Sequence, residues 1–208
     1  MFNGLVRKTL YDKRGFMLGW SLGIVVMAAI TVAFFPTIKD QIGTLFANVP
    51  KALESITGSS EDYKNITGYV GTGVFDLRIP MLTITMAIIL ALGLGVGEES
   101  SGKLYQLLAQ PLSRSQIVFK KWLAMTGIFA VVHIALFGGV LATIKLIHES
   151  MSLHQLLAGI VMCFLLTLAV GSLTFLVGFS TGRKDLSLML VTSYVFGGYL
   201  LTSFATQI

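Results

Sequence analysis

The sequence is poor in charged residues and nearly free of cysteine. Of its 208 residues only 12% are Asp, Glu, Lys or Arg, whereas 54% are hydrophobic. An average soluble domain carries about 25% charged residues, so this composition excludes an ordinary soluble domain. The single cysteine, Cys163, excludes a disulfide within the chain and every metal motif built from paired cysteines.

Long apolar stretches dominate the sequence instead. A membrane-spanning helix needs about 20 mostly apolar residues, and five segments contain such a stretch. They are residues 15–38, 79–97, 113–147, 152–182 and 186–208. In lipid the backbone N–H and C=O groups must bond within the segment, so these segments should be helices. The sequence therefore predicts an all-α fold, a polytopic transmembrane helix bundle of five spans in a single domain over residues 1–208.

Positive charge gathers at one end of the predicted spans. Most of the 15 Lys and Arg residues precede the first span, or lie between the second and third or between the fourth and fifth. They are Arg7, Lys8, Lys13, Arg14, Lys103, Arg114, Lys120, Lys121, Arg183 and Lys184. The positive-inside rule places these segments, and with them the N-terminus, in the cytoplasm. A nucleic-acid-binding protein would cluster its charge on one soluble face, so we expect membrane lipid and no nucleic acid as a partner.

Two segments are predicted to lie outside the spans. Residues 1–14 carry apolar side chains near i, i+3, i+4 and i+8 among basic ones, which is typical of an amphipathic interfacial helix. A basic tail that only orients the first span is the alternative. Residues 39–78 are the longest polar segment and are expected to form an outer loop.

Two capping boxes mark predicted helix starts. Ser113 with Gln116 follows Pro111, and Ser152 with Gln155 precedes the fourth apolar stretch. In such a box the Ser oxygen accepts a hydrogen bond from a first-turn N–H, and the Gln side chain accepts one from the Ser N–H. The short connection before the fourth span predicts that the third and fourth spans form an antiparallel hairpin.

Small residues four apart occur at Gly19 and Gly23, and again at Gly178 and Gly182. Such pairs let helix backbones approach closely in a membrane. The approach can be within the chain or against a second chain, and the sequence leaves both interpretations open.

The polar segment between the second and third spans has helical features of its own. Gly102 breaks the preceding helix and Pro111 stops the segment. Between them lie leucines at i, i+3 and i+4, namely Leu104, Leu107 and Leu108. We predict a short amphipathic cytoplasmic helix within residues 98–112, whose apolar stripe docks into a protein groove or rests on lipid.

The same segment nearly matches a phosphate-binding loop, but its chemistry is wrong. Leu104 stands where such a loop needs the Ser or Thr hydroxyl that holds magnesium, and Glu98 and Glu99 would repel a triphosphate. His148, Glu149 and His154 lack the spacing of a zinc site. No catalytic constellation is visible in the sequence, so we expect no enzyme activity, cofactor or metal in this chain.

His133 lies near the middle of the third predicted span. Polar residues at that depth are costly and usually face the bundle interior or a water-filled cavity. His133 therefore lines a substrate path or hydrogen-bonds a neighbouring helix, and the sequence leaves both possibilities open.

The order of residues that begins at Glu98 resembles the signature of the ABC type-2 permease family. The shared positions are Glu98, Gly102, Leu104, Leu107, Leu108, Ala109, Pro111, Leu112, Ser113, Arg114, Ile117 and Lys121. In that family a Glu closes the second span, Gly-Thr-Leu opens a short cytoplasmic helix, and Pro-hydrophobe-Ser-Arg leads into the third span. Lys103 replaces the usual Thr and leaves the helix pattern intact. Family members usually have six spans, so the resemblance implies that this sequence stops before a sixth.

The resemblance implies a transport subunit driven by a separate ATP-binding cassette subunit, which would hold the ATP and magnesium. The residues implied in docking that subunit are Glu98, Glu99, Gly102, Leu104, Tyr105, Leu107, Leu108, Pro111 and Arg114. The leucines would form the docking face, the charged residues would fix its orientation, and the tyrosine would be an aromatic anchor. A second permease chain, identical or different, would complete the path in a bacterial plasma membrane.

The sequence and the resemblance lead to two hypotheses about function, which come from different classes. The first is the permease subunit of an ATP-driven exporter that moves a hydrophobic or amphipathic substrate, such as a drug, lipid or peptide, out across the membrane. The alternative is a non-transport membrane protein with an assembly, immunity or sensor role, whose residues 98–112 lie on lipid. An intramembrane enzyme is a third class, which the absence of paired catalytic groups disfavours.

Overall fold

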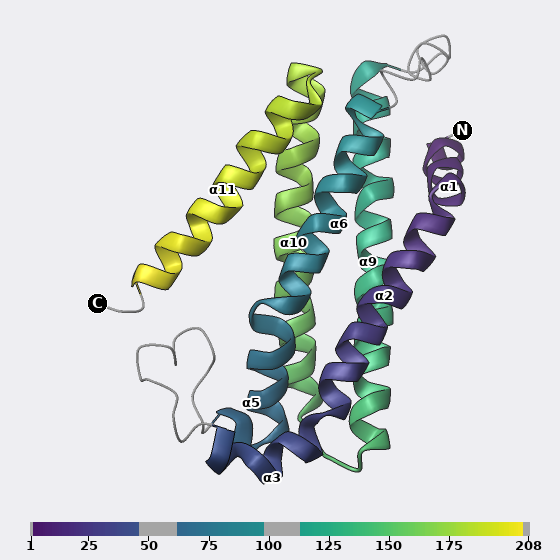
Figure 1. The fold of residues 1–208 in the computed structure, drawn as a ribbon. Coiled ribbons are helices and arrows are strands. Elements are labelled where there is room, and N and C mark those ends of the chain that lie inside the picture. The colour runs from purple at the N-terminus through teal and green to yellow at the C-terminus, as the bar shows by residue number, and fades with distance from the viewer. Residues whose placement is uncertain (1, 46–61, 98–112, 206–208) are drawn as a thin grey trace.

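The computed structural model describes residues 2–45, 62–97 and 113–205, and these residues contain helices and no strand (Figure 1). The prediction of an all-α polytopic bundle is confirmed. Four long helical units pack side by side: α2 (Arg14–Ala33), α6 (Arg78–Leu94), α9 (Arg114–Leu146) and α10 (Leu153–Thr181). In Figure 1, α2 and α6 lie in front of α9 and α10.

Shorter helices complete the two ends of the bundle. At one end α1 (Phe2–Asp12) packs against α9, and the predicted N-terminal segment is indeed helical. At the other end α3 (Phe35–Leu45) lies across the bundle, near α5 (Ile66–Val70) and the 3-10 turn η2 (Asp62–Lys64) (Figure 1). The Tyr69 hydroxyl on α5 donates a 2.8 Å hydrogen bond to the Thr31 carbonyl of α2, which ties this end together.

Four helical stretches are long and apolar enough to cross a membrane: Arg14–Gln41, Ile66–Leu94, Ser115–Leu146 and Leu153–Thr181. The second begins well before the predicted start at residue 79. Its first part is α5 and the π-helix η3 (Gly71–Asp76), so the expected outer loop of residues 39–78 is partly helical. α11 (Lys184–Ala205) occupies the described part of the predicted fifth span but is not among these four, and its far end diverges from α10 in Figure 1.

One predicted capping box forms and the other does not. The Ser113 hydroxyl accepts a hydrogen bond from the Gln116 N–H, and the Gln116 side chain accepts one from the Ser113 N–H, both at 3.3 Å. Ser152 is the N-cap of α10, but its side chain makes no capping bond, so the second box is wrong. The α9–α10 connection is nevertheless short, and the two helices form the predicted antiparallel hairpin.

Glycines set the closest helix contacts of the core. A Cβ on Gly171 of α10 would lie 2.7 Å from the Phe129 ring of α9, and one on Gly139 of α9 would lie 2.5 Å from Val25 of α2. Both positions therefore admit only glycine at this helix spacing. Gly182 has a different role, since it ends α10 in the left-handed conformation, with a φ of 62°.

Candidate functional site

The predicted docking residues lie at the connection between α6 and α9. Residues 98–112 fall outside the described ranges, and with them Glu98, Glu99, Gly102, Leu104, Tyr105, Leu107, Leu108 and Pro111. Arg114 is the first residue of α9. The structure does describe the two helix ends that flank the segment, and Figure 1 places both at the same end of the bundle. We call this the basic end, after Lys13, Lys120, Lys121, Arg183 and Lys184.

A buried lysine joins the two flanking helices at the basic end. Lys121 of α9 is only 1% exposed, and its Nζ donates a 3.0 Å hydrogen bond to the Leu94 carbonyl, the last residue of α6. The carbonyls at a helix C-terminus carry partial negative charge, so an ammonium group is favoured there. The same Nζ lies 5.7 Å from the centre of the Phe179 ring on α10. Three helices thus meet at Lys121.

Other basic side chains gather around the same helix end. A Cβ built on Gly93 would lie 3.7 Å from the Lys13 Nζ, and one on Gly97 would lie 4.0 Å from the Lys184 Nζ. Lys120 is 2% exposed. Basic side chains from several parts of the chain therefore lie close to the C-terminal end of α6, where Lys121 forms a hydrogen bond.

His133 packs between α9 and α10 and is 2% exposed. Its Nδ1 lies 2.8 Å from the Phe129 carbonyl oxygen, which can only accept, so Nδ1 carries the proton. Its Nε2 lies 3.4 Å from the Thr167 hydroxyl, which itself donates a 2.7 Å hydrogen bond to the Cys163 carbonyl, and the Phe164 ring meets the imidazole edge-on. This geometry favours the role of a helix-joining residue over contact with a substrate.

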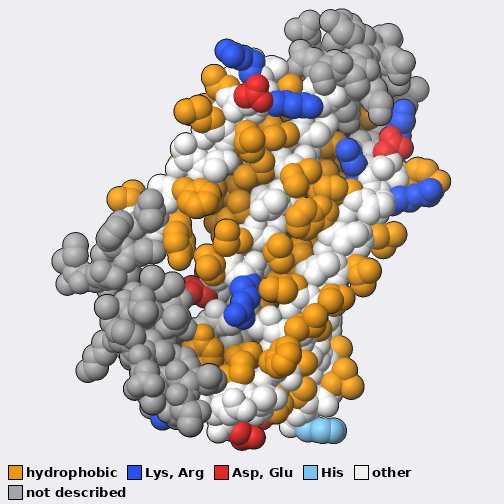
Figure 2. Space-filling view, viewed as in Figure 1, with side chains coloured by type: hydrophobic (Ala, Val, Ile, Leu, Met, Phe, Trp, Pro, Cys, Tyr) orange, Lys and Arg blue, Asp and Glu red, His pale blue; other side chains and the backbone are white. Residues whose placement is uncertain are grey.

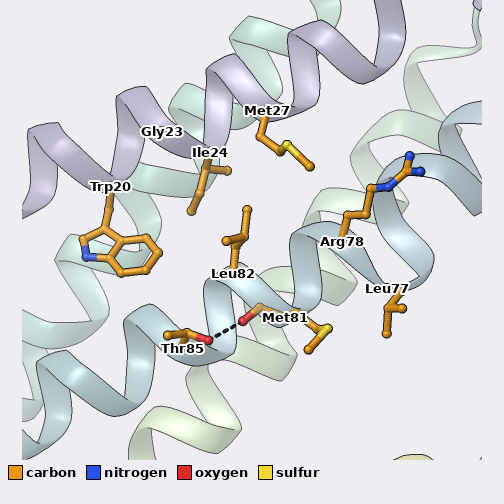
Figure 3. A pocket seen from close by; sticks show the side chains of 9 residues that line it. All are labelled: Trp20, Gly23, Ile24, Met27, Leu77, Arg78, Met81, Leu82 and Thr85. Carbon is orange, nitrogen blue, oxygen red and sulfur yellow. Dashed lines mark hydrogen bonds between the residues drawn. The ribbon is translucent and has the colours of Figure 1, made fainter. Parts of the chain in front are cut away.

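An apolar groove lies between α2 and α6 (Figure 3), and the sequence did not indicate it. Its volume is about 580 Å³, within the range of ligand-binding clefts. The lining residues are Trp20, Gly23, Ile24, Met27, Leu77, Arg78, Met81, Leu82 and Thr85. In Figure 3, Trp20 lies at one end of the groove and Arg78 at the other, with its guanidinium directed away from the lining. No run in the sequence marks the groove, because it depends on how α2 and α6 lie together.

The described residues contain no group of three or more His, Cys, Asp or Glu side chains that could hold a metal ion. Cys163 is buried in the hydrophobic core, where it packs as an apolar side chain.

Comparison with known protein families identifies the chain. The ABC-2 family transporter protein model matches residues 5–206. The chain belongs to the ABC-2 transporter family. It is therefore a multi-pass membrane protein and a permease subunit, and membership in the family implies an ATP-binding cassette partner in general. No curated protein and no solved structure matches the chain.

Proposed function

We propose that this ABC-2 permease is the membrane subunit of an ATP-driven exporter. It would move a hydrophobic or amphipathic substrate out of a bacterial cell, across a plasma membrane in which its N-terminus is cytoplasmic. The observation that carries the proposal is the family match over residues 5–206, nearly the whole chain.

The partner subunit would bind ATP and magnesium and dock on residues 98–112. The proposed roles of the docking residues follow the family resemblance: the leucine stripe forms the contact, Tyr105 anchors it, and Glu98, Glu99 and Arg114 orient it. Closure of two ATP-binding subunits would push this segment. For ATP to drive transport, the ATPase must bind two states of the permease with different affinity.

The geometry of the flanking helices supports such coupling. Lys121 bonds the start of α9 to the end of α6 and contacts α10, so the helices on either side of the docking segment are fastened together. A push on the segment would then tilt α6 and α9 as one unit, and the groove beside α6 would change shape.

Co-purification tests whether an ATP-binding subunit binds this chain at residues 98–112. The tagged chain is extracted in mild detergent beside two variants, Leu107→Asp with Leu108→Asp, and Leu146→Asp with Leu153→Asp. The second pair is a matched control, because both leucines are exposed at the end of the bundle opposite the basic end. We expect a P-loop ATPase with the parent and the control and not with the first variant. An ATPase that stays with the first variant contradicts the docking site, and none with the parent contradicts the exporter and supports the non-transport alternative.

A further inference from the structure

Two charged residues of opposite sign lie side by side in the second membrane span. Asp76 is the last residue of η3 and Arg78 the first of α6, and both side chains are exposed. α6 is 17 residues long, about 25 Å, whereas the hydrocarbon core of a bilayer is about 30 Å thick. With Leu94 at the basic face, Asp76 and Arg78 lie within the membrane thickness, towards its other face.

In the part of the chain that the structure describes, little neutralises these two charges. The Arg78 Nη1 donates a 2.9 Å hydrogen bond to the Gly73 carbonyl, which leaves the other guanidinium donors exposed. Among the residues that the structure describes, no ion pair includes either Asp76 or Arg78. Charged side chains exposed to hydrocarbon are costly, so residues of this kind usually face water or another protein. The π-helix that carries Asp76 is also a feature often found at functional sites.

The neighbouring surface of α2 is shaped for close contact with another helix. Gly15, Gly19 and Gly23 recur every four residues, and a Cβ built on any of them would meet nothing within 4 Å. Packing within the chain therefore gives no reason for glycine there, unlike at Gly139 and Gly171. Gly23 and Arg78 line the same groove, so one of the open glycines and one of the exposed charges lie on one face. Figure 2 shows hydrophobic side chains spread over the length of the described surface in this view, with charged side chains fewer and scattered.

We propose that this α2–α6 face binds a second copy of the chain, with Asp76 of each copy paired to Arg78 of the other. The inference rests on the proposed function, together with the second permease chain that the family resemblance implies, and adds the surface at which the two chains meet. Two copies with the same topology are related by an axis along the membrane normal, so residues of equal depth face each other. One copy carries both signs at nearly one depth, which makes the surface self-complementary. An anionic lipid would neutralise Arg78 and leave Asp76 unpaired.

Reversing the charges at Asp76 and Arg78, singly and together, tests the proposal. The full chain and its variants Asp76→Arg and Arg78→Asp are reconstituted in vesicles, and self-association is measured by energy transfer between labelled copies. Each single variant places like charges opposite each other twice, and we expect the dissociation constant to rise by about tenfold or more. The double variant keeps both attractive pairs and should return to within about threefold of the parent. Lys39→Glu serves as a control, because the Lys39 partner is Glu149 of the same chain.

A mixture of the two single variants gives the sharpest result. One variant then presents two positive charges and the other two negative charges, so mixed pairs should form more readily than either variant pairs with itself. Circular dichroism of each variant checks that it is folded. Unchanged self-association in the single variants, no preference for mixed pairs, or a monomeric parent would each overturn the proposal. Co-purification of the ATPase does not depend on this face, so failure here is distinct from failure of the proposed function.

Discussion

The α9–α10 interface and the α2–α6 face both carry polar groups in membrane-spanning helices. The polar group at the interface is buried, whereas those at the face are exposed. At the first, the His133 imidazole is buried and meets the Phe129 carbonyl and the Thr167 hydroxyl. At the second, Asp76 and Arg78 are exposed and have no ion pair among the described residues. A polar group satisfied within the chain stabilises the protomer, whereas one left exposed in a membrane usually faces water or another protein.

Glycine shows the same contrast between the two regions. Gly171 is required because the Phe129 ring fills the space where a side chain would be, whereas Gly23 has open space beside it. The first glycine belongs to the packing of one chain, and the second lies on the surface proposed to bind a second copy. The predictions below separate these two kinds of residue.

The largest effect on stability is expected from Gly171→Leu. The new side chain would overlap the Phe129 ring, since even a Cβ would lie 2.7 Å from it. Overpacking of this kind costs about 2–3 kcal/mol, so thermal unfolding in detergent should begin several degrees lower. An unfolding temperature equal to that of the parent would show that α9 and α10 can separate freely, contrary to the packing described.

A smaller loss of stability is expected from Lys121→Met, which keeps the length of the side chain but removes its charge. The Leu94 carbonyl would lose its 3.0 Å hydrogen bond in a buried position, at a cost of about 1–2 kcal/mol. The measurement is thermal unfolding together with ATP-driven transport, and both should fall. Lys8→Met is the control, because Lys8 is exposed. Equal effects of the two substitutions would argue against the role given to Lys121.

His133→Leu should lower the stability of the fold less than Gly171→Leu or Lys121→Met. Hydrogen bonds between membrane helices contribute about 0.6 kcal/mol on average, and the leucine would still fill the space beside Phe164. We expect a slightly lower unfolding temperature and unchanged transport of the substrate. Loss of transport with stability retained would instead place His133 in the substrate path.

The smallest effect on the protomer is expected from Gly23→Leu. Since a Cβ there meets nothing within 4 Å, the unfolding temperature of the monomeric chain in detergent should not change. Self-association in vesicles should weaken, because the new side chain would keep a second helix away. A change in the unfolding temperature as large as that of Gly171→Leu would remove the distinction between the two faces.

Apolar stretches and capping chemistry predicted much of the fold. The all-α bundle, the start of α9 at the Ser113 capping box and the α9–α10 hairpin all follow from local sequence. The second span was predicted to begin at residue 79 because Asp76 and Arg78 were interpreted as loop residues, whereas the helical stretch begins at Ile66. Hydropathy treats a charge as the end of a span, and it has no information on how tertiary or quaternary contacts hold that charge. The groove was missed for the same reason, since it depends on how α2 and α6 lie together.

ATP-driven transport by the reconstituted complex, with the parent or with Arg114→Glu, tests the central claim most directly. Substrate uptake into inside-out vesicles and ATP hydrolysis are measured on the same preparation. If the ATPase drives this permease through residues 98–112, reversal of the charge at the start of α9 should abolish uptake while hydrolysis continues. Uptake equal to that of the parent at the same rate of hydrolysis would contradict the account.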